Sequence, residues 1–235
     1  MTKKVIVTGA SRGIGFELVK QYAEAGHEVL AISRNGDKLE HLKKLCLAIN
    51  PKAIVHTVSF DLAEDNLNSN LLPYISKCFK HVDVLINNAG ALVAKPFVEI
   101  SAEELQRVYS VNVLSVFKLT QLLVPLFSSK AHIVNISSVG GIQGSVKFAG
   151  LTAYSSSKAA LLSLTECLAE EYKETDWAFN CLALGAVQTE MLEEAFPGYQ
   201  APTSAVEMAS YIYDFSLNGN KFYKGKVLNV SKSTP

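Results

Sequence analysis

The sequence has few features of a disulfide framework, a metal site or a charged binding surface. Its 235 residues include four cysteines, and 22 Lys and Arg balance 22 Asp and Glu. Cys46, Cys78, Cys167 and Cys181 are widely separated and have no Cys or His at metal-ligand spacing, which favours free thiols and no metal. The balanced charge, without a run of five like charges, argues against nucleic acid or an anionic membrane as a partner.

Long apolar runs are also missing. The amino-terminal Met1 to Lys4 leads into the short apolar run Val5 to Val7, which is too brief for the core of a signal peptide. No run approaches the roughly 20 apolar residues that a transmembrane helix needs. We therefore expect a cytoplasmic protein without a membrane span, and the length suits a single α/β domain.

Strand-like apolar runs alternate with stretches of helical periodicity along the chain. Parallel strands need long crossovers that cover the sheet, so this alternation predicts an α/β fold: a doubly wound, mostly parallel, seven-stranded Rossmann-like sheet with helices on both faces. We expect one domain over residues 1–235, with a short lid at about 189–204. The predicted strands are Lys4 to Thr8, Glu28 to Ser33, Ala53 to Phe60, Asp83 to Asn87, Ala131 to Ser137, Trp177 to Ala183 and Val227 to Val230. The predicted helices are Gly13 to Ala25, Asp37 to Ile49, Asn66 to Lys80, Ala102 to Phe127, Ala153 to Tyr172 and Ala205 to Leu217.

A glycine-rich turn follows the first predicted strand, with Gly9, Gly13 and Gly15 in a G-x-x-x-G-x-G spacing. Glycine permits positive φ and a close approach of a ligand, and a helix amino terminus offers unpaired N–H groups to a diphosphate. The spacing differs from the G-x-G-x-x-G dinucleotide pattern, so a tight structural connection is the alternative.

The second predicted strand ends with Ser33 and Arg34, at the place where an NAD-binding protein positions an acidic residue for the ribose hydroxyls. A carboxylate there would repel a 2′-phosphate, whereas Arg34, together with Arg12 of the glycine-rich turn, could bind one. This pair favours NADP over NAD. The alternative is that both are ordinary solvated surface arginines.

Residues that could perform catalysis follow the fifth predicted strand. Ser138 comes directly after it, and Tyr154 and Lys158 open the next helix on one face, at i and i+4. A free tyrosine has a pKa near 10, and a neighbouring ammonium group favours the phenolate, so this pair could exchange a proton near physiological pH. Ser101 and Glu104 form a capping box that places Asn112 inside the fourth predicted helix. The alternative to catalysis is that each of these residues, taken singly, serves only in packing, in helix capping or as a solvated surface group.

These motifs together, with Asn88-Ala89-Gly90 after the fourth strand, resemble the short-chain dehydrogenase/reductase family in its compact form, from Val5 to about Thr189. The resemblance implies Tyr154 as general acid/base, Ser138 as a hydrogen-bond donor to the carbonyl oxygen, Lys158 as a ligand of the nicotinamide ribose and Asn112 as support for a proton-relay water. The implied cofactor-binding residues are Gly9, Ser11, Arg12, Gly13, Ile14, Gly15, Ser33, Arg34, Asp61, Leu62, Asn88, Ala89, Gly90, Tyr154, Lys158, Gly185, Val187 and Thr189. The implied reaction is NADPH-dependent reduction of a ketone, an aldehyde or a 3-oxoacyl thioester, or the reverse oxidation of a secondary alcohol.

The chain departs from the family pattern in four places. Leu184 stands where a proline is usual, and the connection from Ser138 to Tyr154 is longer than usual. The lid segment between Thr189 and Ser204 is brief, and the family's Asp-Gly-Gly tail is missing after Val230. That tail helps to assemble tetramers, so a homodimer is expected as readily as a homotetramer. The alternative function is that of an NADP-binding sensor or scaffold without turnover, against which the complete set of catalytic residues argues.

Overall fold

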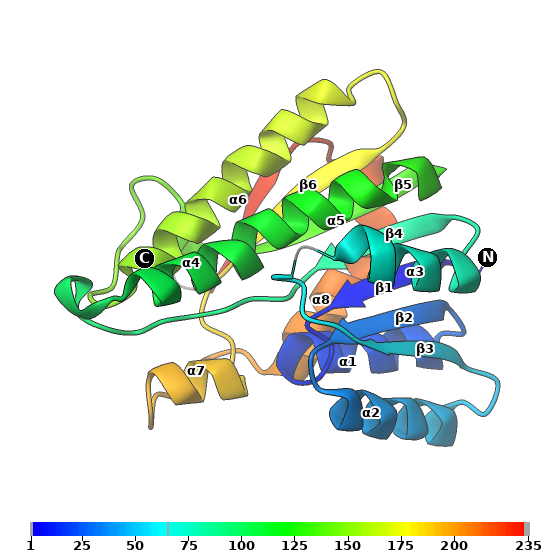
Figure 1. Cartoon of the computed structure of the whole chain (residues 1–235), viewed down its shortest axis with the longest axis horizontal. Helices are drawn as coiled ribbons and strands as arrows, with labels where there is room; N and C mark the ends of the chain where they lie inside the picture. Colours follow the sequence, from blue (N-terminus) through cyan, green and yellow to red (C-terminus); the bar gives the residue numbers. More distant parts are fainter. Residues whose placement is uncertain (1, 65, 233–235) are drawn as a thin grey trace.

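The computed structural model describes residues 2–64 and 66–232, and a seven-stranded parallel sheet runs through it (Figure 1). The strand order is β3-β2-β1-β4-β5-β6-β7. The chain moves outwards from β1 to β3 and then returns to begin the other half with β4, so β1 and β4 flank the switch point at which such sheets bind ligands. The predicted doubly wound α/β fold is confirmed. The strands are β1 (Lys4–Thr8), β2 (Glu28–Ser33), β3 (Ile54–Ser59), β4 (Val82–Asn87), β5 (Phe127–Ser138), β6 (Ala178–Leu184) and β7 (Val227–Val230).

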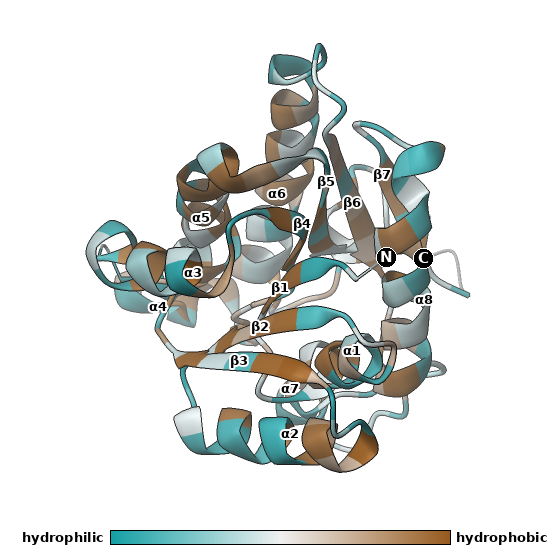
Figure 2. Cartoon of the chain, turned by 90° about the vertical axis from the view of Figure 1, so that its right-hand side faces the viewer, coloured by the Kyte–Doolittle hydropathy of each residue, from teal (hydrophilic) through white to brown (hydrophobic). Residues whose placement is uncertain are grey.

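Helices cover both faces of the sheet (Figures 1 and 2). One face packs against α1 (Gly13–Glu24), α2 (Gly36–Ile49) and α8 (Ala205–Asn218). The other packs against α3 (Leu72–Cys78), α5 (Ser115–Leu123) and α6 (Thr152–Glu171), with α4 (Ala102–Tyr109) leading into α5. The short helix α7 (Glu190–Ala195) is set apart from these layers.

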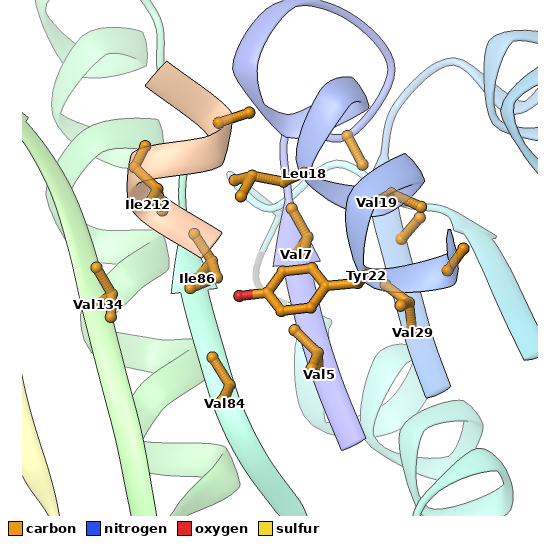
Figure 3. Close-up of a cluster of buried hydrophobic side chains, with 14 of the residues drawn as sticks. Val5, Val7, Leu18, Val19, Tyr22, Val29, Val84, Ile86, Val134 and Ile212 are labelled. Atoms are coloured by element: carbon orange, nitrogen blue, oxygen red, sulfur yellow. The ribbon is translucent and has the colours of Figure 1, made fainter. Parts of the chain in front are cut away.

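Alternate strand residues face the two helical layers. Val5 and Val7 of β1 belong to the core beneath α1 and α8, whereas Ile6 belongs to the core on the opposite face. Tyr22 of α1 is fully buried in the first core (Figure 3), where its hydroxyl forms a hydrogen bond with Ser216 of α8. Both faces of β1 are therefore buried, which explains its continuous apolar sequence.

Two predicted helices are interrupted in the structure. The predicted helix Ala102 to Phe127 consists of α4, a π-helical turn at Ser110–Leu114, α5 and a 3-10 turn at Val124–Leu126 that contains a proline. It ends earlier than predicted, and β5 begins at Phe127 rather than at Ala131. The predicted helix Asn66 to Lys80 begins as a π-helical turn at Leu67–Leu71. Apolar periodicity alone does not distinguish these turns from an α-helix.

The predicted capping box is present: Ser101 Oγ accepts from the N–H of Glu104 at 3.2 Å, and the Glu104 carboxylate accepts from the N–H of Ser101 at 3.0 Å. A second box, between Ser204 and Glu207, opens α8. The predicted lid loop contains α7, whose N-cap Thr189 accepts from the N–H of Leu192 at 3.3 Å. The lid is therefore partly helical.

One helical stretch among the described residues, Ala102–Leu126, is long and apolar enough to cross a membrane by length and composition. The sequence analysis did not identify it, because polar residues interrupt its apolar run. Core helices pass the same test, and 44% of its most apolar window is buried inside the protein. Leu119 and Leu123 pack in the core between α5 and the sheet.

Candidate active site

The turn between β1 and α1 requires glycine at several positions. Gly9 has a φ of 69° and Gly13 a φ of 57°, in the left-handed region that other residues rarely adopt. A Cβ on Gly9 would lie 2.8 Å from the Cα of Ala89, and one on Gly15 would lie 2.5 Å from the carbonyl oxygen of Gly9. The glycines thus hold the turn, the start of α1 and the end of β4 in close contact.

Thr8 and Asn88 fasten this turn to β4. Thr8 Oγ1 accepts from the N–H groups of Asn88 and Ala89, both at 3.0 Å, and donates to the carbonyl oxygen of Ile86 at 3.3 Å. Asn88 Nδ2 donates to the carbonyl oxygens of Thr8 at 2.9 Å and Gly9 at 3.3 Å. The predicted cofactor residue Asn88 therefore uses its amide nitrogen to hold the turn. Sequence reasoning gave Thr8 no role, although its place at the strand end was a signal.

The start of α1 lies against the lid. Arg12, its N-cap, provides no side-chain cap, and the first turn of α1 has no acidic residue. A Cβ on Gly13 would lie 3.3 Å from Thr189 Cγ2 and 3.6 Å from Glu190 Oε2. Arg12 pairs with both carboxylate oxygens of Glu194, with Nη2 lying 3.0 Å from Oε2. This hydrogen bond is the main cause of the raised pKa of Arg12. Sequence reasoning missed both glutamates because it treated their segment as a loop.

The carboxyl end of β2 contains an unsatisfied polar atom. Ser33 Oγ is buried and has no hydrogen-bond partner among the described residues. The next side chain, that of Arg34, is exposed, and its carbonyl oxygen accepts from Ser59 Oγ at 2.8 Å. A cavity of about 410 Å³ opens here, lined by Arg34, Ser59, Phe60, Asp61, Glu64 and Asn70.

Asp61, at the edge of this cavity, is held by Arg107 of α4. Arg107 Nη2 lies 3.1 Å from Oδ1 and 2.9 Å from Oδ2 of Asp61, and the N–H of Ala63 donates to Oδ1 at 3.0 Å. Burial opposes ionisation of Asp61, but these hydrogen bonds hold its pKa below the ordinary value. The neighbouring Leu62 side chain is buried in the core. Sequence reasoning did not identify Arg107.

Ser138, Tyr154 and Lys158 come together at the carboxyl end of β5. Ser138 ends β5, and its Oγ accepts from the N–H of Gly140 at 3.2 Å. Tyr154 and Lys158 lie near the start of α6, and the Tyr154 hydroxyl is close enough to Ser138 for that side chain to influence its pKa. Lys158 Nζ donates to the carbonyl oxygen of Ile136 at 2.8 Å and lies 5.7 Å from the centroid of the Tyr154 ring.

Burial controls the protonation of this group. It raises the pKa of Tyr154 to about 12, and the neighbouring Ser138 side chain acts in the opposite direction. It lowers the pKa of Lys158, which is 4% exposed, to about 8, and the nearby Cys181 acts weakly in the other direction. The expected depression of the Tyr154 pKa by the Lys158 ammonium is therefore wrong for this state of the protein. Desolvation is the largest cause of the shift for both groups.

Asn112 lies within the π-helical turn and is fully buried. Its Oδ1 accepts from the N–H of Ala91 at 2.8 Å, and its Nδ2 donates to the carbonyl oxygen of Ala91 and to Ser157 Oγ, both at 2.9 Å. A Cβ on Gly90 would lie 3.7 Å from Asn112 Oδ1 and 3.8 Å from Lys158 Nζ. Both amide hydrogens of Asn112 are thus in use, and its side chain positions the segment after β4 against α6.

The side chains of the segment after β6 serve mainly for packing and for pairing with β7. Leu184 is the last residue of β6, is buried and pairs with Val230 of β7. The N–H of Gly185 donates to the carbonyl oxygen of Val230 at 2.9 Å, and a Cβ on Gly185 would lie 2.5 Å from Ser231 Oγ. The Val187 side chain is buried in the core. Leucine thus takes the position of the expected proline by extending the strand.

The described residues fit a dinucleotide cofactor. The glycine-rich turn, with Ser11 and Ile14 in it, provides a backbone surface beside the uncapped amino terminus of α1. Ser33 offers an unpaired hydroxyl group at the next strand end. In residues 2–64 and 66–232, no three His, Cys, Asp or Glu side chains are grouped to hold a metal ion. The four cysteines are free thiols.

Comparison with known proteins agrees with this site. Residues 3–200 match the family described as short chain dehydrogenase. The chain is 33% identical over 193 residues to dehydrogenase/reductase SDR family member 7B from Bos taurus, covering 80% of this chain but 58% of that protein. It is 32% identical over 199 residues to L-2,3-butanediol dehydrogenase from Corynebacterium glutamicum, covering 83% of this chain and 75% of that protein. A putative short chain dehydrogenase from Shigella flexneri complexed with NADP is 28% identical and superimposes with a TM-score of 0.88, covering 97% and 96% of the two chains.

The fold and the family match define the class of protein as a short-chain oxidoreductase. The chain belongs to the short-chain dehydrogenase/reductase family.

Proposed function

We propose that the chain is an NADPH-dependent carbonyl reductase or alcohol dehydrogenase, acting on a ketone, an aldehyde, a 3-oxoacyl thioester or a secondary alcohol. The observation that carries this proposal is the meeting of Ser138, Tyr154 and Lys158 beside the switch point between β1 and β4. Residues 1–235 act as one NADP-binding domain, with the lid at 189–204 over the site.

Tyr154 is the proton donor in the reducing direction. The Tyr154 hydroxyl is protonated at neutral pH, as a tyrosine with an ordinary pKa near 10 also is, so it can give a proton to the carbonyl oxygen of the substrate. Ser138 lies next to that hydroxyl and donates to the same oxygen, where negative charge develops. The nicotinamide, when bound, supplies the hydride. Lys158 holds the nicotinamide ribose, and Asn112 keeps the segment after β4 in place beside it.

NADP is the preferred cofactor. The exposed Arg34 and the unpaired Ser33 hydroxyl lie at the strand end where the adenosine ribose binds in such folds, and no acidic residue follows Ser33 directly. A guanidinium group can form charge-assisted hydrogen bonds with a 2′-phosphate. The other implied residues, including Asp61, Gly185 and Thr189, contact the cofactor through backbone or carboxylate groups at the rim of the same crevice.

The substrate is a small molecule with an apolar body. Large apolar side chains are exposed on the segments beside the site, including Phe97, Val146 and Phe148. Lys95 N–H donates to the carbonyl oxygen of Gly150 at 3.1 Å, which joins these two segments. The protein acts in the cytoplasm as a homodimer or homotetramer. Three exposed apolar residues support such an assembly: Leu105 of α4, Leu114 of the π-helical turn and Phe117 of α5.

The test compares the wild-type protein with Tyr154→Phe. The wild type is expected to bind NADPH, measured by nicotinamide fluorescence, and to oxidise it in the presence of at least one compound from a panel of ketones, aldehydes and 3-oxoacyl thioesters. Tyr154→Phe should bind NADPH with little loss, while turnover falls by about 10²- to 10⁴-fold, because it lacks only the proton donor. Normal turnover by this variant would refute the mechanism. Binding by the wild type without any turnover would favour a sensor or scaffold.

A further inference from the structure

The lid brings two carboxylates to the parts of the cofactor site that attract anions. Glu190 and Glu194 lie at i and i+4 of α7, so they share one face of this short helix. The Glu194 carboxylate pairs with Arg12. The Glu190 carboxylate approaches Gly13, the first residue of α1. Each carboxylate therefore stands where a phosphate of the proposed cofactor would be attracted.

The first turn of α1 contains no residue that could itself supply a negative charge to the amino terminus of the helix. The helix has no side-chain cap and no acidic residue in its first turn, so its N–H groups and positive dipole end attract the nearest negative charge. Glu190 supplies that charge from the lid, and it also contributes to the raised pKa of Arg12. A cofactor diphosphate bound at the same helix end would experience repulsion from Glu190.

The base of the lid is fixed independently of these two glutamates. The N–H of Gln188 donates to the carbonyl oxygen of Thr203 at 2.8 Å, and Gln188 Oε1 accepts from the N–H of Ala201 at 2.8 Å. Glu193, also on α7, is bonded within the lid: its Oε1 accepts from the N–H of Gly198 at 3.1 Å. The Glu190 and Glu194 side chains take no part in these contacts, so breaking the pair between Arg12 and Glu194 leaves the lid base intact.

We propose that Glu190 and Glu194 set the cofactor affinity and the cofactor selectivity of this protein by competing with the cofactor phosphates. Glu194 competes with the 2′-phosphate for Arg12, and Glu190 competes with the diphosphate for the amino terminus of α1. This inference rests on the proposed function, because it takes NADP as the ligand of Arg12. The lid carboxylates thus weaken cofactor binding, an effect that cannot be recognised from the cofactor-binding residues alone.

The experiment measures dissociation constants for NADPH and NADH by nicotinamide fluorescence in Glu194→Gln, Glu190→Gln and the wild type. Glu193→Gln is the matched control, since it removes the same charge from the same helix. An exposed ion pair contributes about 0.2–1 kcal/mol, so Glu194→Gln should bind NADPH about 1.4- to fivefold more tightly, with a smaller gain for NADH. Glu190→Gln should tighten both cofactors by similar factors. Both gains should shrink as salt is raised from 0.05 to 0.5 M, because these charges are exposed to screening.

The outcomes separate this inference from the proposed function. Binding of neither cofactor by the wild type would overturn both. Normal cofactor binding by the wild type, with Glu194→Gln and Glu190→Gln no different from Glu193→Gln, would overturn only the competition. Weaker NADPH binding by Glu194→Gln would also overturn it, because Glu194 would then support the bound state. Circular dichroism of each variant establishes that it is folded.

Discussion

Replacing Lys158 with methionine should abolish activity. It should also remove the free-energy cost of burying the Lys158 ammonium group in the folded protein. Methionine has a similar length and no charge. Burial lowers the pKa of Lys158 from 10.5 to about 8, and at about 1.4 kcal/mol per pH unit this difference corresponds to about 3 kcal/mol against the charged form. The substitution also leaves the buried carbonyl oxygen of Ile136 without its donor, at a cost of about 1–3 kcal/mol. At pH 7.5 the two effects leave the variant as stable as the wild type or up to about 2 kcal/mol more stable.

The pH dependence separates these two effects. A lysine whose pKa is lower in the folded than in the unfolded state binds fewer protons when folded, so the wild type gains stability as pH rises from about 8 towards 10.5. The lost hydrogen bond has no such dependence. The stability of Lys158→Met relative to the wild type should therefore fall by roughly 2 kcal/mol between pH 7.5 and pH 10. Urea unfolding followed by circular dichroism measures this, with the exposed Lys52→Met as a control. A difference that stays constant across this range would refute the reasoning.

Three other substitutions test the cofactor site and the core. Arg34→Ala should weaken NADPH binding by roughly tenfold or more and NADH binding little, because only NADPH has the 2′-phosphate; equal losses in fluorescence titration would contradict its role. Burial lowers the pKa of His132 to about 4, so the wild type should lose roughly 3 kcal/mol of unfolding free energy as pH falls from 7 to 4, and His132→Gln should show a shallower loss in urea titrations. Gly9→Ala should cost about 1–3 kcal/mol more than Gly26→Ala, since both have positive φ but only Gly9 packs against Ala89. Equal urea midpoints for these two variants would show that the close contact has no energetic effect.

The sequence was sufficient to predict the sheet, most of the helices and the proximity of Ser138, Tyr154 and Lys158, because these depend on local patterns. The continuous apolar run of β1 and the glycines of the turn after it are visible without any structure. The i, i+4 spacing of Tyr154 and Lys158 places them together on any helix. Ser138 could be placed near them because β5 leads directly towards α6.

The features that the sequence analysis missed depend on contacts between distant segments. Arg107 is recognisable as a partner of Asp61 only when α4 lies beside the end of β3. Glu194 is recognisable as a partner of Arg12 only when α7 lies against the glycine-rich turn. The direction of the Tyr154 pKa depends on how fully the ring is desolvated, which spacing along a helix does not report.

Folding leaves two polar groups of the site, Ser33 and Lys158, in an incomplete or unfavourable environment, and it leaves a third, Arg12, paired with the lid. Ser33 Oγ is buried without a partner, the Lys158 ammonium group is buried against a backbone carbonyl group, and Arg12 is paired with a glutamate of the lid. A dinucleotide offers these groups hydroxyl and phosphate partners that the protein does not supply itself. Its binding would therefore relieve penalties that folding has already imposed, while the lid carboxylates oppose it. The affinity of the site is thus a difference between two electrostatic effects, and a single charge on α7 can change it without any change to the groups that contact the cofactor.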